Sequence, residues 1–189
     1  MIRAQSTDKD QIVKILTSSF DDNKSVNYII PPNRNRLERI KELMEYSFEI
    51  CNLFGDVFIT TDKNGCALLL YPDKKSTTLQ SILLDIKFAF TGVGLSNIFN
   101  VMKREATIKK LHPDGSLYYL WFIGVDPNYQ NNGIGSELIS NIICEAKKQN
   151  RTICLETSTT KNLPWYKKNG LKIYNELDLG YKLYFLKSE

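Results

Sequence analysis

Two glycines, Gly133 and Gly135, stand where an apolar strand gives way to an amphipathic helix. The first amide groups of a helix lack partners and carry partial positive charge, so a backbone that glycine leaves uncovered can wrap a pyrophosphate there. The spacing differs from a dinucleotide fingerprint, because Leu138 stands where a third glycine would be needed. A P-loop would require Gly-Lys-Ser/Thr, which this segment lacks. The pattern therefore indicates either an anion site or a structural turn.

Two side chains are candidates for proton transfer. Strand alternation over 152–158 puts Glu156 on one face with Cys154 and Ser158. A carboxylate in such an apolar strand is partly desolvated, which suits a general base. His112, the single histidine, has a ring suited to proton transfer at neutral pH, but its Leu-His-Pro-Asp-Gly context is typical of an exposed loop. The choice between them stays open, and ordered water is a third candidate.

The composition is that of an ordinary globular protein. The chain has 189 residues, 42% hydrophobic and 24% charged, and it predicts one domain spanning 1–189. A net charge of +4 suits an anionic ligand and falls short of a nucleic-acid-binding face, so we expect no nucleic acid partner. No stretch is typical of a signal peptide or a membrane span, and we expect no membrane contact. Scattered cysteines without C-x-x-C spacing predict buried free thiols, no metal and a cytoplasmic location; the four are Cys51, Cys66, Cys144 and Cys154.

The hydrophobic periods predict a mixed α/β order. Helical spacing follows a cap at Ser6 or Thr7 and recurs over about 37–51, 79–90, 95–110, 133–149 and 162–168. Strands are predicted at 57–61, 66–71, 117–125, 152–157, 171–174 and 181–186, the first two joined by an Asn64-Gly65 hairpin turn with positive φ at both residues. Within 79–90, helical spacing puts five apolar residues on one shared face; they are Leu79, Ile82, Leu83, Ile86 and Phe90.

Four pieces of sequence occur in a fixed order. Trp121-Phe122-Ile123-Gly124-Val125-Asp126-Pro127 precedes Gln130-x-x-Gly133-x-Gly135; then come Leu155-Glu156-Thr157-Ser158 and Asn162-x-x-x-Tyr166-x-x-x-Gly170. Together they resemble the coenzyme A-binding core of the GNAT superfamily of N-acetyltransferases, closest to the puromycin-type small-molecule branch. The resemblance covers about Tyr118 to Tyr174. It implies an acyl-CoA N-acyltransferase fold, with a mixed, mostly antiparallel twisted sheet flanked by helices.

The resemblance also implies roles for individual residues. Acetyl-CoA is the expected co-substrate; its pantetheine arm would pair with the strand, its pyrophosphate would bind at the helix start, and Asn162 would contact the arm. The full set is Ile123, Gly124, Val125, Gln130, Asn131, Asn132, Gly133, Ile134, Gly135, Ser136, Asn162 and Tyr166. Tyr166 would protonate the departing thiolate as the general acid, and Glu156 is the first candidate for the base.

The segment 79–110 is an insertion beyond the shared core, and we expect it to wall the acceptor site or to cap the sheet. Asn131 and Asn132 depart from the family's usual Arg or Gly and remove charge from the phosphate site. A basic cluster at Lys147, Lys148, Arg151, Lys167 and Lys168 is either a contact to the ribose 3′-phosphate or a solvated face.

The sequence thus predicts an acetyl-CoA-dependent N-acetyltransferase that acts on the primary amine of a small molecule by direct transfer in a ternary complex. The protein would be a monomer or homodimer. The alternatives are acetylation of a protein or peptide and a coenzyme A-binding sensor without turnover.

Overall fold

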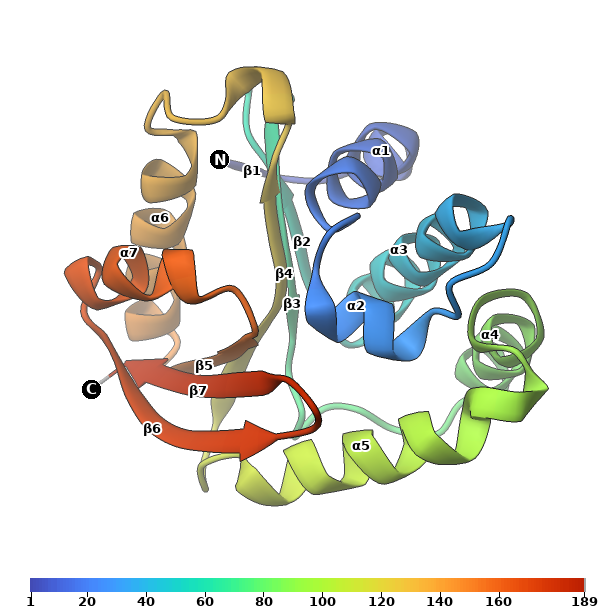
Figure 1. Ribbon diagram of the computed structural model, residues 1–189. Helices are drawn as coiled ribbons and strands as arrows, with labels where there is room; N and C mark the ends of the chain where they lie inside the picture. The colour runs from blue at the N-terminus through green and yellow to red at the C-terminus, as the bar shows by residue number, and fades with distance from the viewer. Residues whose placement is uncertain (189) are drawn as a thin grey trace.

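The computed structural model of the protein describes residues 1–188. A seven-stranded sheet with strand order β1-β2-β3-β4-β5-β7-β6 runs through its centre (Figure 1). Neighbouring strands are antiparallel except β4 and β5, which run parallel. In Figure 1, α6 and α7 lie on one face of the sheet and α1, α2, α3 and α4 on the other, while α5 runs along its lower end. This confirms the expected α/β architecture, a mixed and mostly antiparallel sheet flanked by helices.

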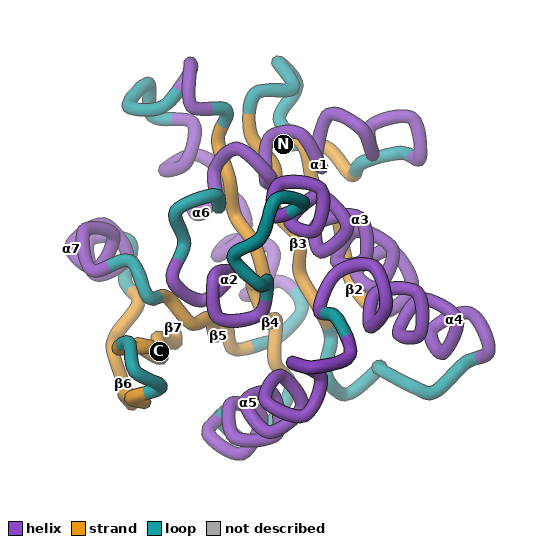
Figure 2. Tube along the Cα trace, turned by 45° about the vertical axis from the view of Figure 1, so that its right-hand side comes forward, coloured by secondary structure: helices purple, strands orange, loops and turns teal. Residues whose placement is uncertain are grey.

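The strands are β1 Ile2–Arg3, β2 Gly55–Ile59, β3 Gly65–Leu70, β4 Leu117–Val125, β5 Thr152–Thr157, β6 Leu171–Asp178 and β7 Lys182–Ser188. The helices are α1 Lys9–Ser19, α2 Lys24–Ile29, α3 Arg36–Phe54, α4 Leu79–Phe88, α5 Ile98–Leu111, α6 Ile134–Lys148 and α7 Leu163–Lys168. A loop without regular structure joins β3 to α4 (Figure 2). The sequence did not predict β1 or α2, because both are too short to show a hydrophobic period. β1 has two residues, and α2 has six residues after its N-cap Asn23.

The helical periods predict the core well. Ile12, Ile15 and Leu16 of α1 are buried against α3 and one face of the sheet, and Leu138, Ile139 and Ile142 of α6 are buried on the other. Apolar stripes at this spacing must bury against another layer, which is why the sheet has a separate core on each face. These two cores fix β3 and β4 between α1 and α6.

Two local details of the expected elements are wrong. The capping box at the first helix uses Gln5 and Asp8, since a 3₁₀ turn over Ser6–Asp8 precedes α1. In the hairpin, positive φ occurs at Lys63 and not at Asn64 or Gly65. The Asp62 carboxylate instead accepts hydrogen bonds from Thr60 and Asn64 and shapes the turn.

The helical insertion differs most from expectation. Its break falls between the two predicted helical stretches, in a π-helical turn over Ala89–Val93 followed by Gly94 at φ +78°. The periodic face of α4, however, points outward. Leu79 is 76% exposed and Leu83 is 59% exposed, whereas Ser81, Leu84 and Phe88 on the opposite side pack inward.

Three of the four cysteines are buried free thiols, as expected. Burial raises the pKa of Cys51, Cys66 and Cys154 above the ordinary thiol range. Cys144 is exposed on α6, so the expectation was wrong there; its position lies on the side of that helix opposite the buried stripe.

Candidate active site

The parallel pair β4 and β5 separates after a short contact. Only Leu117, Tyr118 and Tyr119 pair with β5, although β4 continues to Val125 and β5 to Thr157. On their outer edges the strands stay paired, β4 with β3 and β5 with β7. The facing edges beyond Tyr119 therefore have no strand partner within residues 1–188. An extended ligand can pair with such an edge as an added strand does.

A β-bulge shapes β4 at the point where it separates. Leu68 of β3 pairs with Phe122 and Leu69 pairs with Leu120, so Trp121 is the extra residue. A bulge of this kind bends a strand and increases its twist. The bulge thus lies three residues before Gly124.

Gly124 is instead the contact point for α1. A Cβ built on it would lie 2.8 Å from Leu16 Cδ2, so any side chain would have to displace the buried Leu16 side chain of α1. Ser19 at the end of α1 donates a hydrogen bond to the carbonyl of Val125 at 2.9 Å. Close packing of α1 on this face of β4 therefore explains the glycine. The edge of β4 that faces β5 stays uncovered.

The turn before α6 requires left-handed backbone at two positions. Asn131 has φ +65° and Gly133 has φ +84°. Asparagine and glycine tolerate this conformation best, which accounts for both residue types. Gly133 is the N-cap residue, so no side chain caps the helix, and the first amides of α6 are left for a ligand. The backbone of this turn thus has the arrangement that an anion site requires, and the binding of an anion there stays a prediction.

Side chains of this turn mostly support the loop itself. Gln130 donates to the carbonyl of Val125 at 3.2 Å, and Asn132 donates to that of Tyr129 at 3.3 Å. Ser136 accepts a hydrogen bond from the Trp165 indole at 3.0 Å, which ties α7 to the start of α6. Ile134 lines the cleft described below, as do Gly133 and Gly135.

Tyr166 lies on α7 and is 6% exposed. Pro164 in the first turn and Gly170 at φ +82° after the helix confine α7 to the short span that the sequence predicts. Burial raises the pKa of the Tyr166 hydroxyl above its usual range, so the group stays protonated at neutral pH. Within residues 1–188 its hydroxyl has no hydrogen-bond partner, so it is free to donate to a ligand. Tyr166 and Asn162 both line the cleft.

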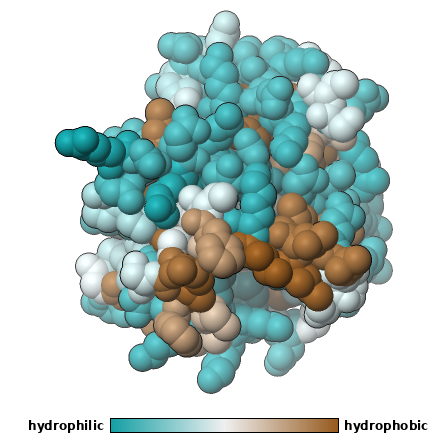
Figure 3. All heavy atoms as spheres, turned by 90° about the vertical axis from the view of Figure 1, so that its right-hand side faces the viewer, coloured by the Kyte–Doolittle hydropathy of each residue, from teal (hydrophilic) through white to brown (hydrophobic). Residues whose placement is uncertain are grey.

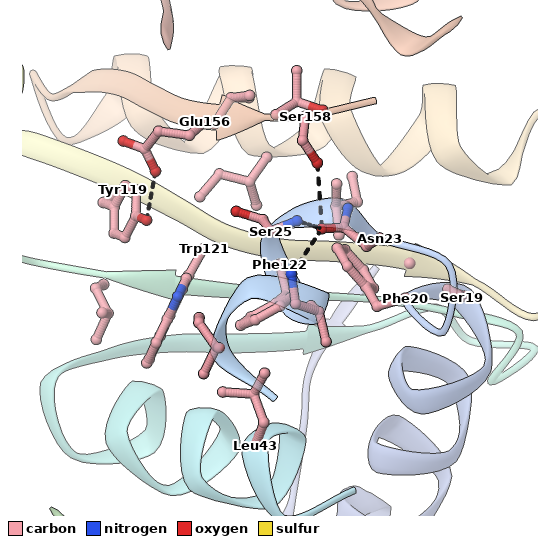
Figure 4. A pocket seen from close by; sticks show the side chains of 18 of the residues that line it. Ser19, Phe20, Asn23, Ser25, Leu43, Tyr119, Trp121, Phe122, Glu156 and Ser158 are labelled. Atoms are coloured by element: carbon pink, nitrogen blue, oxygen red, sulfur yellow. Dashed lines mark hydrogen bonds between the residues drawn. The ribbon is translucent and has the colours of Figure 1, made fainter. Parts of the chain in front are cut away.

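Glu156 and His112, which sequence reasoning treated as rivals, are bonded to each other. His112 Nε2 lies 2.8 Å from Glu156 Oε1, and the Tyr119 hydroxyl donates to Glu156 Oε2 at 2.7 Å (Figure 4). The side chains of His112 and Glu156 are 14% and 7% exposed. His112 is therefore not an exposed loop residue. Pro113 forces the residue before it out of helical backbone, which ends α5 and turns the imidazole toward β5.

One open cleft connects these groups. Its volume is about 1460 Å³, and its walls include the free edge of β4, the start of α6, Tyr166 and the Glu156–His112 pair. A single small ligand typically occupies ~300–1,000 Å³. The cleft has room for a donor and an acceptor together.

The wall of the cleft opposite the start of α6 and Tyr166 is largely apolar. It includes Phe20, Tyr46, Phe88 and Trp121, with Ile86 and Met102 toward solvent. Tyr46 stacks on Phe88 with ring centroids 4.6 Å apart and meets Trp121 edge to face. Figure 4 shows Trp121, Phe20 and Phe122 lying between the sheet and the helices of this wall.

Sequence reasoning missed several residues of the site. Tyr119 was read only as part of an apolar strand, and Ser158 bonds Asn23, the N-cap of α2, at 3.4 Å. The lysine that lines the donor side of the cleft is Lys161. None of the basic cluster at 147–168 lines it; Arg151, for example, pairs with Asp73 at 2.7 Å. No group of three or more His, Cys, Asp or Glu within residues 1–188 is placed to hold a metal ion.

Residues 98–173 match a family model described as an acetyltransferase (GNAT) domain. This segment runs from α5 into β6 and contains every donor-side feature described above. Over these residues the chain is similar to the GNAT acetyltransferase family.

Solved structures share the GNAT fold over nearly the whole chain. A Corynebacterium glutamicum protein described as histone acetyltransferase HPA2 and related acetyltransferase superposes with TM-score 0.73 at 19% identity, covering 99% of this chain and 93% of that one. The C-terminal condensation domain of Ebony, in complex with β-alanyl-dopamine, has TM-score 0.72 at 10% identity and coverage of 100% and 97%. An N-acetyltransferase from Staphylococcus aureus Mu50 has TM-score 0.58 at 16% identity and coverage of 98% and 97%. The family match over 98–173 and these structures agree with the expected acyl-CoA N-acyltransferase fold.

Proposed function

We propose that the protein transfers the acetyl group of acetyl-CoA to the primary amine of a small, largely apolar molecule within a ternary complex, as the resemblance to puromycin-type enzymes implies. The observation that carries the proposal is the shared cleft, because the free strand edge, the uncapped α6 amides and two proton-transfer groups all line it. No single one of these features would specify acetyl transfer.

The donor would lie along the gap between β4 and β5. Its pantetheine arm would pair with β4 over Ile123, Gly124 and Val125, and its pyrophosphate would bind the amides from Gly133 to Ser136. A strand amide aimed at the thioester carbonyl would stabilise the developing oxyanion. Asn162 and Lys161, at the mouth beside α7, would contact the arm and a phosphate.

Two protein groups would move protons as the C–N bond forms and the C–S bond breaks. An ammonium has no lone pair, so the acceptor must first lose a proton. If His112 Nε2–H donates to Glu156, the imidazole Nδ1 is left to accept that proton, and the carboxylate stabilises the resulting imidazolium. Tyr166 would protonate the departing thiolate of coenzyme A. We therefore assign the role of the base to the hydrogen-bonded Glu156–His112 pair, in place of either residue alone.

Direct transfer is favoured over an acetyl-cysteine intermediate. None of the four cysteines lines the cleft within residues 1–188. Burial raises the pKa of Cys154, the thiol nearest in sequence to Glu156, and a protonated thiol is a poor nucleophile. The donor and acceptor must therefore bind together, which the volume of the cleft permits.

A thiol-release assay tests the proposal. The chain is mixed with acetyl-CoA and either a panel of primary amines of increasing apolar size or peptides with free N-termini and lysines. Coenzyme A is measured with a thiol-reactive dye, and the Cys144→Ser variant removes the exposed protein thiol that would react with the dye. We expect turnover to rise with apolar amines.

Turnover with peptides alone would replace the small-molecule assignment by protein acetylation. Acetyl-CoA binding without release from any acceptor would indicate a sensor.

A further inference from the structure

The helical insertion presents a second apolar surface that the acetyltransferase site does not use. Eight of the eleven large hydrophobic side chains exposed in residues 1–188 lie between Leu79 and Met102, so they form a local concentration. Six of them are outside the cleft: Leu79, Ile82, Leu83, Phe90, Leu95 and Phe99. We call these six the outer apolar face. Figure 3 shows hydrophobic side chains gathered in a band across this side of the molecule.

The helices are built to be apolar on two sides. On α4, Phe88 packs inward while Leu79 and Leu83, one turn apart, point to solvent at 76% and 59% exposure. On α5, Ile108 is buried against the end of the sheet, whereas Phe99 is 83% exposed. Ordinary surface helices are polar on the side away from the core, so this arrangement indicates a partner.

Positive charge borders the outer apolar face. Residues 79–111 carry five basic and two acidic side chains, a net +3 of the +4 of the whole chain. Lys103 and Lys110 follow Phe99 at intervals that place all three on one side of α5. Within residues 1–188, Lys103, Lys109 and Lys110 have no acidic partner. An apolar face with flanking lysines matches the interface of an anionic bilayer, where apolar groups enter the acyl boundary and lysines meet phosphates.

The geometry favours lying on a bilayer over crossing it. No single helix within residues 1–188 is long and apolar enough to span a bilayer. The pair Leu79–Val93 and Leu95–Leu111 has the length and composition of a span only when both helices are taken together, and it is bent by 100°. The ten residues of α4 reach only about 15 Å, half of a hydrocarbon core. A second copy of the chain is a poorer occupant, because a two-fold contact would bring two basic segments together.

We propose that the outer apolar face and its lysines dock the protein on an anionic lipid surface. Ile86 and Met102 lie in the same helices and line the cleft, so the mouth of the cleft would open beside the lipid. The docking does not depend on acetyl transfer, but it would give an apolar amine dissolved in the bilayer a short path to the acceptor wall. It also replaces our expectation of no membrane contact.

Vesicle co-sedimentation of the full chain tests this proposal without any turnover. Vesicles contain phosphatidylcholine alone or with about one-third phosphatidylglycerol, at low and high salt. We expect binding to the anionic vesicles that weakens with salt. The double variant Leu83→Asp/Phe99→Asp should lose it, and Lys103→Gln/Lys110→Gln should weaken it roughly fivefold per lysine.

Leu37→Asp is the matched control, since Leu37 is 56% exposed on α3 and lies outside the insertion. It should bind like the wild type. All substituted side chains are exposed, and acetyl-CoA binding by every variant checks that the fold is kept. Equal sedimentation of wild type and Leu83→Asp/Phe99→Asp would overturn the proposal. So would a wild-type dimer that ignores vesicles and that the double variant dissociates, because a second copy would then cover the face.

Discussion

The two walls of the cleft differ in the kind of atoms that line them: one presents mainly backbone, and the other presents side chains. The donor side consists mainly of backbone, the free edge of β4 and the first amides of α6, held by a bulge at Trp121 and by left-handed turns at Asn131 and Gly133. The acceptor side consists of side chains from α2, α3, α4, α5 and β4 that meet only in the folded chain. The donor wall can therefore recognise one invariant ligand, while the acceptor wall can change with any of several helices.

The largest expected effect concerns the α6 amides. Gly135→Val should abolish acetyl-CoA binding, because the branched side chain would cover the amides that hold the pyrophosphate. The backbone tolerates a side chain there, since a Cβ would lie 3.6 Å from Trp165. Isothermal titration calorimetry measures the loss. Ser140→Val, an exposed position on the same helix, is the control; unaltered affinity of the Gly135 variant would place the phosphate site elsewhere.

Tyr166→Phe should lower kcat by about 10²-fold with little change in the KM for acetyl-CoA, since the hydroxyl acts only on the leaving thiolate. Steady-state kinetics with a saturating amine measures the effect. Tyr184→Phe removes a hydroxyl that packs against the same core cluster and should keep full activity. Equal rates for the Tyr166 variant and the wild type would remove the tyrosine from the mechanism.

The Glu156–His112 pair should behave as one unit. Glu156→Gln and His112→Asn should each lower kcat by about 10-fold near neutral pH, and the double variant should be no worse than either. The loss should shrink as pH rises, because more of the amine is then unprotonated without help. Additive losses that do not vary with pH would indicate two separate structural roles.

On the acceptor side, neighbouring residues of α4 offer a matched pair. Ile86 lines the cleft and Leu83 does not, although both are partly exposed. Ile86→Asn should raise the KM for an apolar amine about fivefold by removing apolar contact, while the KM for acetyl-CoA stays constant. Leu83→Asn should change neither constant in the absence of lipid. Equal changes in the KM for acetyl-CoA and in the KM for the amine would contradict the assignment of Ile86 to the acceptor wall.

The folded chain as a whole, both walls of the cleft included, has one expected response to alkaline pH. Burial raises the pKa of Tyr46, Tyr118, Tyr119, Tyr166 and Tyr174 above the usual 10.0, and that of three cysteines above 9.0. The folded chain keeps these protons while the unfolded chain releases them, so stability is complete below pH 9 and falls above it. The free energy of unfolding should drop by at least about 1.4 kcal/mol per pH unit beyond pH 10. Urea titrations measure it; a flat profile to pH 11 would contradict the burial of these groups.

The difference between the walls also explains what the sequence could reveal. The donor site rests on a short ordered set of residue types, since Gly133 is needed for positive φ and Tyr166 lies at a fixed offset within α7. Those features are local, and the sequence predicted their positions in the fold correctly. The assignment of ligand contacts to them stays a prediction.

The acceptor side could not be predicted in the same way. The bond between His112 and Glu156 joins residues 44 positions apart, and nothing local to either residue signals it. The period of α4 was correct, but periodicity gives the spacing of an apolar face and not what covers it. Leu79 and Leu83 share the apolar face that the period predicts and are nevertheless exposed, because Phe88 and Leu84 on the other side already pack against the protein.

A crystal structure with acetyl-CoA bound would test the central claim most directly. The account predicts the pantetheine arm between β4 and β5, the pyrophosphate on the amides of Gly133 to Ser136, and the thioester sulfur within hydrogen-bond reach of the Tyr166 hydroxyl. A donor bound outside the gap between the strands, or a thioester that faces neither Tyr166 nor the Glu156–His112 pair, would contradict it.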